Sequence, residues 1–287
     1  MSKTYPALTR RALIAKFALG AAVLTWAPLA LVHWQQHIRV EHVTIPPEAN
    51  PSSPAIRLAQ LSDLHVANSS DVRRLERAVE MTRALQPDAI VLTGDYVWRA
   101  TGHMDLVTPL LARLEAPLGV YAVLGNHDIW VDRDAVTQGL EEAGVRVLIN
   151  KGVILEQGDA SVYLGGLDDG WVGRPDLDQA LADHNGDQPV VLLFHEPDLG
   201  HDLVTEGRVW LQLSGHTHGG QVRIPGYGAP ILPEYGRQYE QGLYRVGPGW
   251  IYVNRGLGTT MVPVRFYAPP EITLLELYPN QPGAKTT

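Results

Sequence analysis

The chain has 287 residues, no cysteine and a formal net charge of −8 at pH 7. The absence of cysteine excludes disulfides and thiolate metal sites, so a bound metal would need His, Asp, Glu or Asn ligands. The negative charge disfavours a general nucleic-acid surface, which is usually basic, but it allows a small phosphate substrate that is held through metal cations.

Residues 1–34 are predicted to form a hydrophobic helix that acts as a membrane anchor or a signal. The uncharged apolar run at 17–32 has sixteen residues, fewer than the ~20 that span a bilayer. If Lys16 snorkels to the interface, the run extends back to residue 12 and reaches that length. The pair Arg10-Arg11 also resembles a twin-arginine export signal.

The same segment predicts a topology. The candidate cleavage site after Ala27 is followed by Pro28, which favours an uncleaved anchor over a removed peptide. Basic residues before the apolar run and few after it predict that the N-terminus stays inside. We therefore expect a single span in a bacterial-type inner membrane, with the remaining chain outside the cytoplasm.

Three further regions follow the apolar segment. Residues 35–54 are rich in Pro, Glu and Asn and are interpreted as a linker or a leading strand. Residues 55–279 form the predicted catalytic domain, and 280–287 form a tail. No internal repeat is evident in the sequence.

Three helices are predicted from apolar spacing and end signals. The first covers 71–85, with Asp71 as its N-cap and Pro87 beyond its end. The others cover 104–114 and 132–143, and Gly144 is a suitable residue to end the last one.

Short apolar runs separate these helices and predict strands that are covered on both faces. They lie at 56–61, 89–92, 120–124, 190–194 and 210–213, and further strands are expected over 250–277. Alternation of such strands with helices is typical of an α/β or layered sandwich fold.

Each of the five runs ends in polar residues that suit catalysis or metal binding. If the runs are strands of one sheet, their carboxyl ends meet at one crevice. The clusters contain Asp63 and His65; Asp95; Asn126, His127 and Asp128; His195; and His216 and His218.

A single histidine after a strand is usually structural, and Gly-Asn-His-Asp alone is compatible with a turn. Five clusters in this order favour a metal site over these alternatives and over an anion site. Oxygen and imidazole ligands suit Mn, Fe, Zn, Ni or Co, and two ions would need a shared carboxylate. On an extended chain, His216 and His218 would present both imidazoles to one side.

The motifs resemble the calcineurin-like metallophosphoesterase superfamily, whose signature is D-x-H, G-D, G-N-H-D/E, a lone H and G-H-x-H. The resemblance covers roughly residues 55–277. Two segments, GHTHGGQ at 215–221 and NRGLGTTMVPVRF at 254–266, resemble a membrane-associated phosphodiesterase branch related to UDP-2,3-diacylglucosamine hydrolases. The resemblance implies an α/β fold of the layered αββα sandwich type, after an N-terminal hydrophobic helix, and two divalent metal ions.

Residue roles are implied by the same resemblance. Asp95 would bridge the ions, His127 would lie beside the scissile phosphate, and Asp128 would orient His127. The remaining ligands would be Asp63, His65 and His218 for the first ion, and Asn126, His195 and His216 for the second.

The implied activity is phosphodiester hydrolysis by a metal-activated hydroxide, with a phosphate-ester small molecule or a lipid-linked compound as substrate. Alternatives are a phosphomonoesterase, a UDP-2,3-diacylglucosamine pyrophosphatase in lipid A synthesis, and a non-catalytic metal-binding scaffold. The lipid A alternative conflicts with the predicted topology, because that UDP-lipid lies on the cytoplasmic leaflet.

Residues outside the motifs are weaker candidates. Arg99 is a candidate phosphate-binding residue, and Trp98, His103 and Trp130 are candidates for a substrate groove. The alternative is that these aromatic residues pack loops. For Asp168, Asp169 and Trp171, capping or turn formation is the preferred interpretation.

Overall fold

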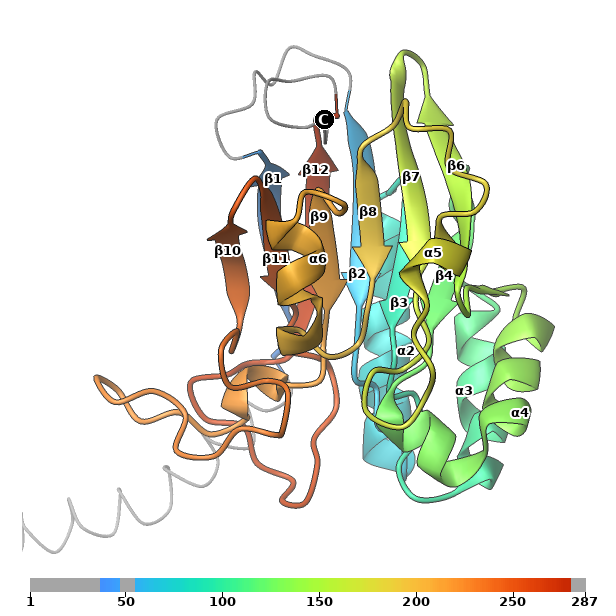
Figure 1. Ribbon diagram of the computed structural model, residues 1–287. Helices are drawn as coiled ribbons and strands as arrows, with labels where there is room; N and C mark the ends of the chain where they lie inside the picture. Colours follow the sequence, from blue (N-terminus) through green and yellow to red (C-terminus); the bar gives the residue numbers. More distant parts are fainter. Residues whose placement is uncertain (1–36, 47–54, 280–287) are drawn as a thin grey trace, which may run out of the picture.

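Two six-stranded sheets pack face to face, and helices cover the outer face of each sheet (Figure 1). The computed structural model describes residues 37–46 and 55–279. The predicted α/β layered sandwich is confirmed. The hydrophobic segment at 1–34 and the tail at 280–287 lie outside the described residues. No helix in the described ranges has both the length and the apolar character needed to cross a membrane.

The first sheet has the strand order β1-β12-β2-β3-β4-β5. Strands β2 to β5 are parallel, β12 is antiparallel to β2, and β1 is parallel to β12. In register, Leu58 pairs with Ala89 and Ile90 pairs with Val120. The bounds are β1 Arg39–Ile45, β2 Ile56–Leu61, β3 Ala89–Thr93, β4 Val120–Val123, β5 Arg146–Val147 and β12 Glu271–Leu277.

The second sheet has the order β10-β11-β9-β8-β7-β6. Its central strands β7, β8, β9 and β11 are parallel, while β6 and β10 run antiparallel at the two edges. The bounds are β6 Lys151–Gln157, β7 Ala160–Gly166, β8 Val190–Leu193, β9 Leu211–Ser214, β10 Gly242–Val246 and β11 Gly249–Val253.

Helices cover the sheets unequally. The longer ones pack on the first sheet and two short ones pack on the second. Their bounds are α2 Ser69–Ala84, α3 Met104–Leu111, α4 Asn126–Glu142, α5 Leu177–Ala180 and α6 His201–Thr205, and three 3₁₀ turns lie at Thr101–His103, Asp198–Gly200 and His218–Gly220.

Three hydrophobic cores separate the four layers. Alternate residues of a strand point to opposite faces, so Ala59 packs toward the helices whereas Leu58 packs between the sheets. The helix-facing core of the first sheet also includes Leu75 of α2 and Leu140 of α4. Both faces of the central strands are therefore buried, which explains their continuous apolar sequences.

The predicted helices exist, but their ends differ. The N-cap of α2 is Asn68 rather than Asp71, because the Asn68 side chain accepts hydrogen bonds from the Ser70 and Asp71 amides. Helix α3 ends at Leu111, three residues before the predicted end.

Helix α4 begins at Asn126, six residues before the predicted start at Asp132. The backbone of Asp132 is non-helical (φ −179°, ψ 103°), and its carboxylate accepts from the amides of Asp134 and Ala135. The sequence signal at Asp132 is thus a real capping signal, but it marks a restart within α4 after a kink. The predicted end at Gly144 is confirmed, since Gly144 follows the helix with a φ of 78°.

The segment predicted as a linker or leading strand contains β1, which pairs with β12 along its whole length. The first strand of the folded domain therefore precedes the boundary expected at residue 55. Its half-buried, mostly polar sequence conceals it, because β1 is an edge strand of the first sheet.

Candidate metal centre

The five predicted clusters meet at one end of the molecule, but they come from two sheets rather than one. The strands β2, β3 and β4 belong to the first sheet, and β8 and β9 belong to the second. The buried side chain of Gln60 joins the sheets there, because its amide nitrogen lies 3.0 Å from both the Thr93 hydroxyl and the Ser214 carbonyl oxygen. The convergence was predicted on the assumption that all five strands share one sheet, and that assumption was wrong, since apolar runs alone do not assign strands to sheets.

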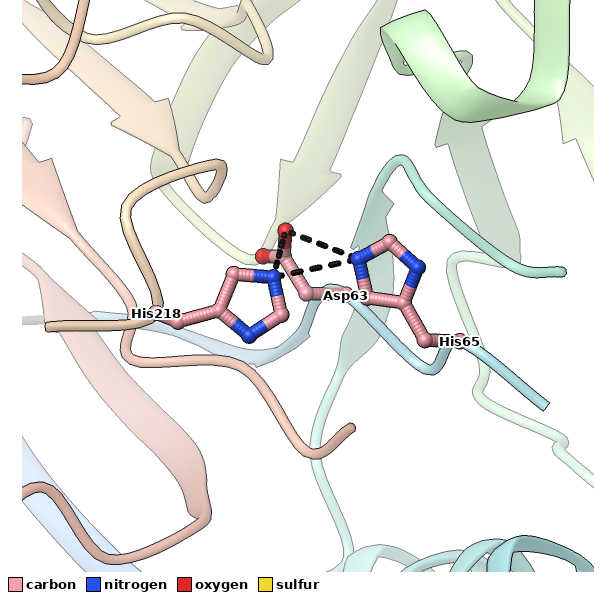
Figure 2. Close-up of side chains that lie close together, drawn as sticks. All are labelled: Asp63, His65 and His218. Atoms are coloured by element: carbon pink, nitrogen blue, oxygen red, sulfur yellow. Dashed lines mark hydrogen bonds and ion pairs between the residues drawn. The ribbon is translucent and has the colours of Figure 1, made fainter. Parts of the chain in front are cut away.

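The first group of candidate ligands contains Asp63, His65 and His218 (Figure 2). The Nε2 atoms of His65 and His218 are 3.1 Å apart. Asp63 Oδ1 lies 3.3 Å from His218 Nε2 and 3.9 Å from His65 Nε2. All three side chains are buried. Two imidazole nitrogens and one carboxylate oxygen therefore face one small space.

The second group contains His195, Glu196 and His216, and Asp95 stands between the two groups. Asp95 Oδ2 lies 3.3 Å from His65 Nε2 and 3.3 Å from His195 Nε2. One carboxylate oxygen thus reaches imidazoles of both groups. That is the position expected of a carboxylate shared by two ions.

Glu196 was not predicted as a site residue. It is fully buried, and its Oε2 accepts a hydrogen bond from the Gly170 amide. Burial, together with the nearby carboxylate of Asp169, raises the pKa of the Glu196 carboxyl well above its ordinary value. The available signal was its place directly after His195 at the end of β8.

The candidate ligands sit on turns and not on extended chain. The backbone is left-handed at Asp63, His65, Asp95, His216 and His218, with φ values between 42° and 70°. Such values are uncommon for residues other than glycine and concentrate at functional sites. The expectation of an extended chain was therefore wrong. His216 and His218 consequently reach different groups instead of one.

Hydrogen bonds between these turns hold the arrangement. The Asp63 amide donates to the Gly94 carbonyl at 2.9 Å, and the His65 amide donates to the Asp95 carbonyl at 3.0 Å. Gly125 allows the close approach, because a Cβ there would lie 2.4 Å from Asp95 Oδ1. The site is thus built by contacts between turns of different strands.

Two imidazoles have their tautomers set by backbone carbonyls. His195 Nδ1 lies 2.6 Å from the Thr93 oxygen, and His216 Nε2 lies 2.7 Å from the Glu234 oxygen. A carbonyl oxygen can only accept, so each of these nitrogens must donate. The other nitrogen of each ring, Nε2 of His195 and Nδ1 of His216, therefore has a free lone pair in the neutral ring.

Unpartnered buried atoms test whether the residues suit a cation. Buried polar atoms nearly always have a hydrogen-bond partner. Asn126 Oδ1 and His195 Nε2 are buried without one. Asn126 Oδ1 and, in the neutral ring, His195 Nε2 are electron-pair donors that cations bind, so the donor set fits one or more divalent ions.

The carboxylates of the site are held in their ionised form. Burial alone would raise the pKa of Asp63, but the imidazoles of His218 and His195 outweigh it, so the pKa lies below its ordinary value. The same balance lowers the pKa of Asp95, where His195 and His65 outweigh burial. For His195, burial lowers the pKa, but Asp95 and Asp63 outweigh it and raise it well above its ordinary value.

His127 has a different environment. Its ring lies 4.6 Å from the ring of Trp98 and 4.9 Å from that of Trp130, measured between centroids. Burial lowers the pKa of His127 to about 4. Its backbone amide donates to Asp95 Oδ1 at 2.9 Å, which fixes His127 beside the shared carboxylate.

Asp128 was expected to orient His127, but its carboxylate binds backbone amides instead. Its Oδ2 accepts from the amides of Asp95 (2.8 Å) and Gly125 (2.9 Å), and its Oδ1 accepts from the amide of Tyr96 (2.8 Å). The carboxylate therefore fastens the turn that carries Asp95 to the start of α4. Asp128 is a positioning residue that acts through the backbone.

A cavity of about 420 Å³ adjoins the candidate ligands and is mostly apolar. With neutral histidines, Asp95 is the only charged residue among the described residues that line the cavity. Polar members include Asn126, His127, His216 and His218. The apolar lining consists of Trp98, Trp130 and Trp171, and of Val222, Pro230, Ile231, Leu232, Pro233, Met261 and Val262.

Only some of the residues predicted to line a substrate groove lie at the cavity. Trp98 and Trp130 line the cavity, whereas Arg99 does not. Its exposed guanidinium lies over the Trp98 ring, 5.0 Å from the ring centroid. His103 belongs to a 3₁₀ turn before α3 and does not line the cavity either.

The turn interpretation of the loop at 168–171 holds for its two acidic residues but is incomplete for its tryptophan. Asp169 Oδ1 accepts from the amides of Trp171 and Val172, and Asp168 accepts from the Arg174 amide, which confirms the turn interpretation for the two acids. For Trp171 that interpretation was incomplete, because this side chain lines the cavity. Its ring lies 5.1 Å from that of Trp130 and extends the aromatic lining.

Comparisons with known proteins agree with this geometry. Residues 56–220 match the family described as Calcineurin-like phosphoesterase. The chain is 40% identical to the uncharacterized metallophosphoesterase YkuE of Bacillus subtilis over 77% of this chain and 78% of that one. It is 29% identical to the phosphodiesterase YaeI of Escherichia coli over 91% and 96% of the two chains.

A third relative is a pyrophosphatase. The chain is 29% identical to the UDP-2,3-diacylglucosamine pyrophosphatase LpxG of Chlamydia trachomatis, over 90% of this chain and 94% of that one. The relatives thus include a phosphodiesterase and a pyrophosphatase. The protein belongs to the calcineurin-like metallophosphoesterase family and is a metal-dependent phosphoester hydrolase.

Proposed function

We propose that this protein is a dinuclear metal-dependent phosphodiesterase whose substrate carries an uncharged, apolar group on its phosphate. The observation that supports this proposal most strongly is the cavity beside the candidate ligands. Three tryptophans and several aliphatic side chains line it, and no Lys or Arg among the described residues does. A substrate that brings its own apolar group into this cavity buries that surface, which favours binding.

The candidate ligands divide into two sets around one carboxylate. Asp95 is shared between the sets, because a single oxygen of its carboxylate approaches His65 and His195 equally. When bound, the ions supply Lewis-acid chemistry, lowering the pKa of a water and neutralising charge on the phosphoryl group. The first ion would be held by Asp63, His65 and His218, and the second by Asn126, His195 and His216, with Asp95 common to both.

The chain's own residues position the ester. His127 lines the cavity beside Asp95, so its neutral ring is placed to donate a hydrogen bond to a phosphoryl oxygen. Asp128 keeps the Asp95 turn and the start of α4 in register through three backbone hydrogen bonds. The tryptophans exclude water from the ester's apolar group.

Charge favours a diester over a monoester. A diester carries one negative charge and a monoester carries about two near neutral pH. Among the described residues, no Lys or Arg lines the cavity to bind additional charge, and Asp95 lines it. The same argument disfavours a pyrophosphate such as a UDP-sugar lipid, although the aliphatic lining would accommodate acyl chains.

The rates of hydrolysis of two aryl phosphates test the proposal. The purified chain, loaded with Mn, is expected to hydrolyse a bis-aryl phosphate at least about tenfold faster, as kcat/KM, than the corresponding mono-aryl phosphate, a difference of ~1.4 kcal/mol in activation free energy. Faster monoester hydrolysis would identify a phosphomonoesterase. A chain that binds two ions and hydrolyses neither ester would support the scaffold alternative.

Membrane attachment is a separate proposal. The apolar run at 17–32, with basic residues before it, supports a single N-terminal span in a bacterial-type inner membrane and a catalytic domain outside the cytoplasm. A reporter fused to the C-terminus tests the orientation. Reporter activity only in the cytoplasm would contradict it and would make a UDP-lipid substrate accessible.

A further inference from the structure

Two uncharged loops form the outer edge of the cavity, and we call them the rim loops. They cover residues 224–233 (IPGYGAPILP) and 259–264 (TTMVPV). In Figure 1 the loops that contain them extend beyond the sheets at the same end of the molecule. Neither loop contains an acidic or basic residue, which is unusual for surface segments of a chain with 54 charged side chains, 23 basic and 31 acidic.

The rim loops expose large apolar side chains to an unusual extent. Tyr227 is 74% exposed, Ile231 72% and Met261 78%, and Ile224 and Val262 are also exposed. These five account for nearly half of the large exposed apolar side chains of the described chain. Clustered exposure of this kind marks a surface that contacts an apolar partner.

The exposed side chains are held in place by hydrogen bonds. The tip at 224–228 is closed by bonds in both directions between Ile224 and Gly228, at 2.8 and 2.9 Å. Gln221 joins the two loops, since its side chain accepts from the Thr260 amide at 2.8 Å and donates to the Val262 carbonyl at 2.8 Å.

A second bond pattern fastens the loops at their base. The Arg223 amide donates to the Phe266 carbonyl, and the Phe266 amide donates to the Gln221 carbonyl, both at 2.8 Å. The fully buried guanidinium of Arg265 donates to the carbonyls of Gly258 and Ala268. Because the loops are ordered by their own bonds, a partner that binds them does not have to order them first.

The path of the chain indicates which partner covers this surface. The described chain begins just before β1, and the Arg39 amide donates to the Pro270 carbonyl at 2.8 Å, six residues after the second rim loop. The described chain therefore begins on the side of the rim loops, and in the sequence the apolar run at 17–32 ends five residues before His37. A membrane that holds this run would face the rim.

The chemistry of the loops agrees with a lipid surface. Tyrosine and proline-rich turns with aliphatic tips suit the boundary between headgroups and acyl chains. The arginines that flank the first loop are neutralised, Arg223 by Glu240 and Arg237 by Glu234, each at 2.7 Å. Insertion would thus depend on apolar contact and not on attraction to anionic lipids.

We propose that the rim loops dock into the surface of a phospholipid bilayer, so that the mouth of the cavity opens onto the membrane. The inference concerns a surface outside the candidate metal centre and does not require that the protein hydrolyse a diester. It does give an apolar substrate a direct path from the lipid phase to the cavity.

The absence of cysteine allows a direct test with the full chain. Single variants Tyr227→Cys and Met261→Cys are labelled with a nitroxide, and the protein is placed in vesicles of phosphatidylethanolamine and phosphatidylglycerol. Ile154→Cys is the matched control, because Ile154 is an exposed aliphatic residue (42%) on the edge strand β6. Collision rates of each label with oxygen and with a water-soluble nickel complex are then measured.

Docking predicts that the labels at 227 and 261 collide with oxygen several-fold more, relative to nickel, than the label at 154. Equal, water-like ratios at all three positions would overturn the proposal. Low collision rates with both reagents would show that protein covers the rim, either residues 17–32 or, where the labels also broaden one another, a second copy. Hydrolysis of a bis-aryl phosphate by the Tyr227→Cys and Ile154→Cys chains reports the proposed activity separately.

Discussion

Asp128→Asn removes one oxygen from a buried carboxylate that accepts three backbone hydrogen bonds. Two of the bonds share Oδ2, so an asparagine that keeps an oxygen there places its amide nitrogen toward the Tyr96 amide. One buried N–H then has no acceptor, which costs about 1–3 kcal/mol, and the other two bonds lose the assistance of the charge. We expect a total loss of about 2–4 kcal/mol in the free energy of unfolding.

The assay is thermal unfolding together with metal analysis. Burial raises the pKa of Asp128 to about 7, so the measurement is made well above that pH, where the wild-type carboxylate is ionised. For a domain of this size each kcal/mol corresponds to ~2–4 °C, so the Tm should fall by about 4–16 °C. The turn that carries Asp95 loses its bond at Tyr96 and keeps two weaker ones, so the bound metal should also fall.

Asp132→Asn is the matched control, because exposed Asp132 caps the second part of α4 and asparagine caps equally well. Its Tm should change by less than about 2 °C, since surface substitutions usually cost under ~0.5 kcal/mol. If Asp128→Asn behaved like this control and kept full metal and activity, the assignment of Asp128 as a positioning residue would be refuted.

Three further changes test the frame of the site. Gly125→Ala should reduce bound metal and activity, because the added Cβ would lie 2.8 Å from His195 Nε2, whereas Gly102→Ala meets no atom within 4 Å and should have no effect on either. Arg265→Met should cost about 3–5 kcal/mol in a denaturant titration, because buried carbonyls lose their donor, and the exposed Arg245→Met should cost less than ~1 kcal/mol. Removal of metal by a chelator should lower the Tm, because ions present at about a hundred times their Kd add ~2.7 kcal/mol to the free energy of unfolding. Added Mn should restore the Tm. An unchanged Tm would contradict a metal-stabilised site.

The strand ends were predictable because two independent patterns coincide at them. Apolar runs such as 89–92 indicate a strand, and a polar residue such as Asp95 directly after the run indicates where the chain turns toward a ligand. Local sequence could therefore locate Asp63, His195 and His218 at strand ends, and the structure brings them together.

The remaining features depend on long-range contacts. Strand sequences do not reveal that β3 and β8 belong to different sheets, nor that the ligand turns are left-handed. The role of Asp128 depends on amides of a turn more than thirty residues away. Trp171 resembles any loop aromatic until the fold brings it beside Trp130. Tertiary packing decides all of these, and periodicity does not encode it.

Metal content is the measurement closest to the central claim, that strand ends from both sheets hold two cations around Asp95. Elemental analysis of the purified chain after dialysis should give about two ions per wild-type chain. Asp63→Ala and Asn126→Ala, which remove one candidate ligand from each set, should each lose about one ion, and Asp95→Ala should lose both. Two ions retained by the Asp95→Ala chain, or none bound by the wild-type chain at saturating Mn, would contradict the account.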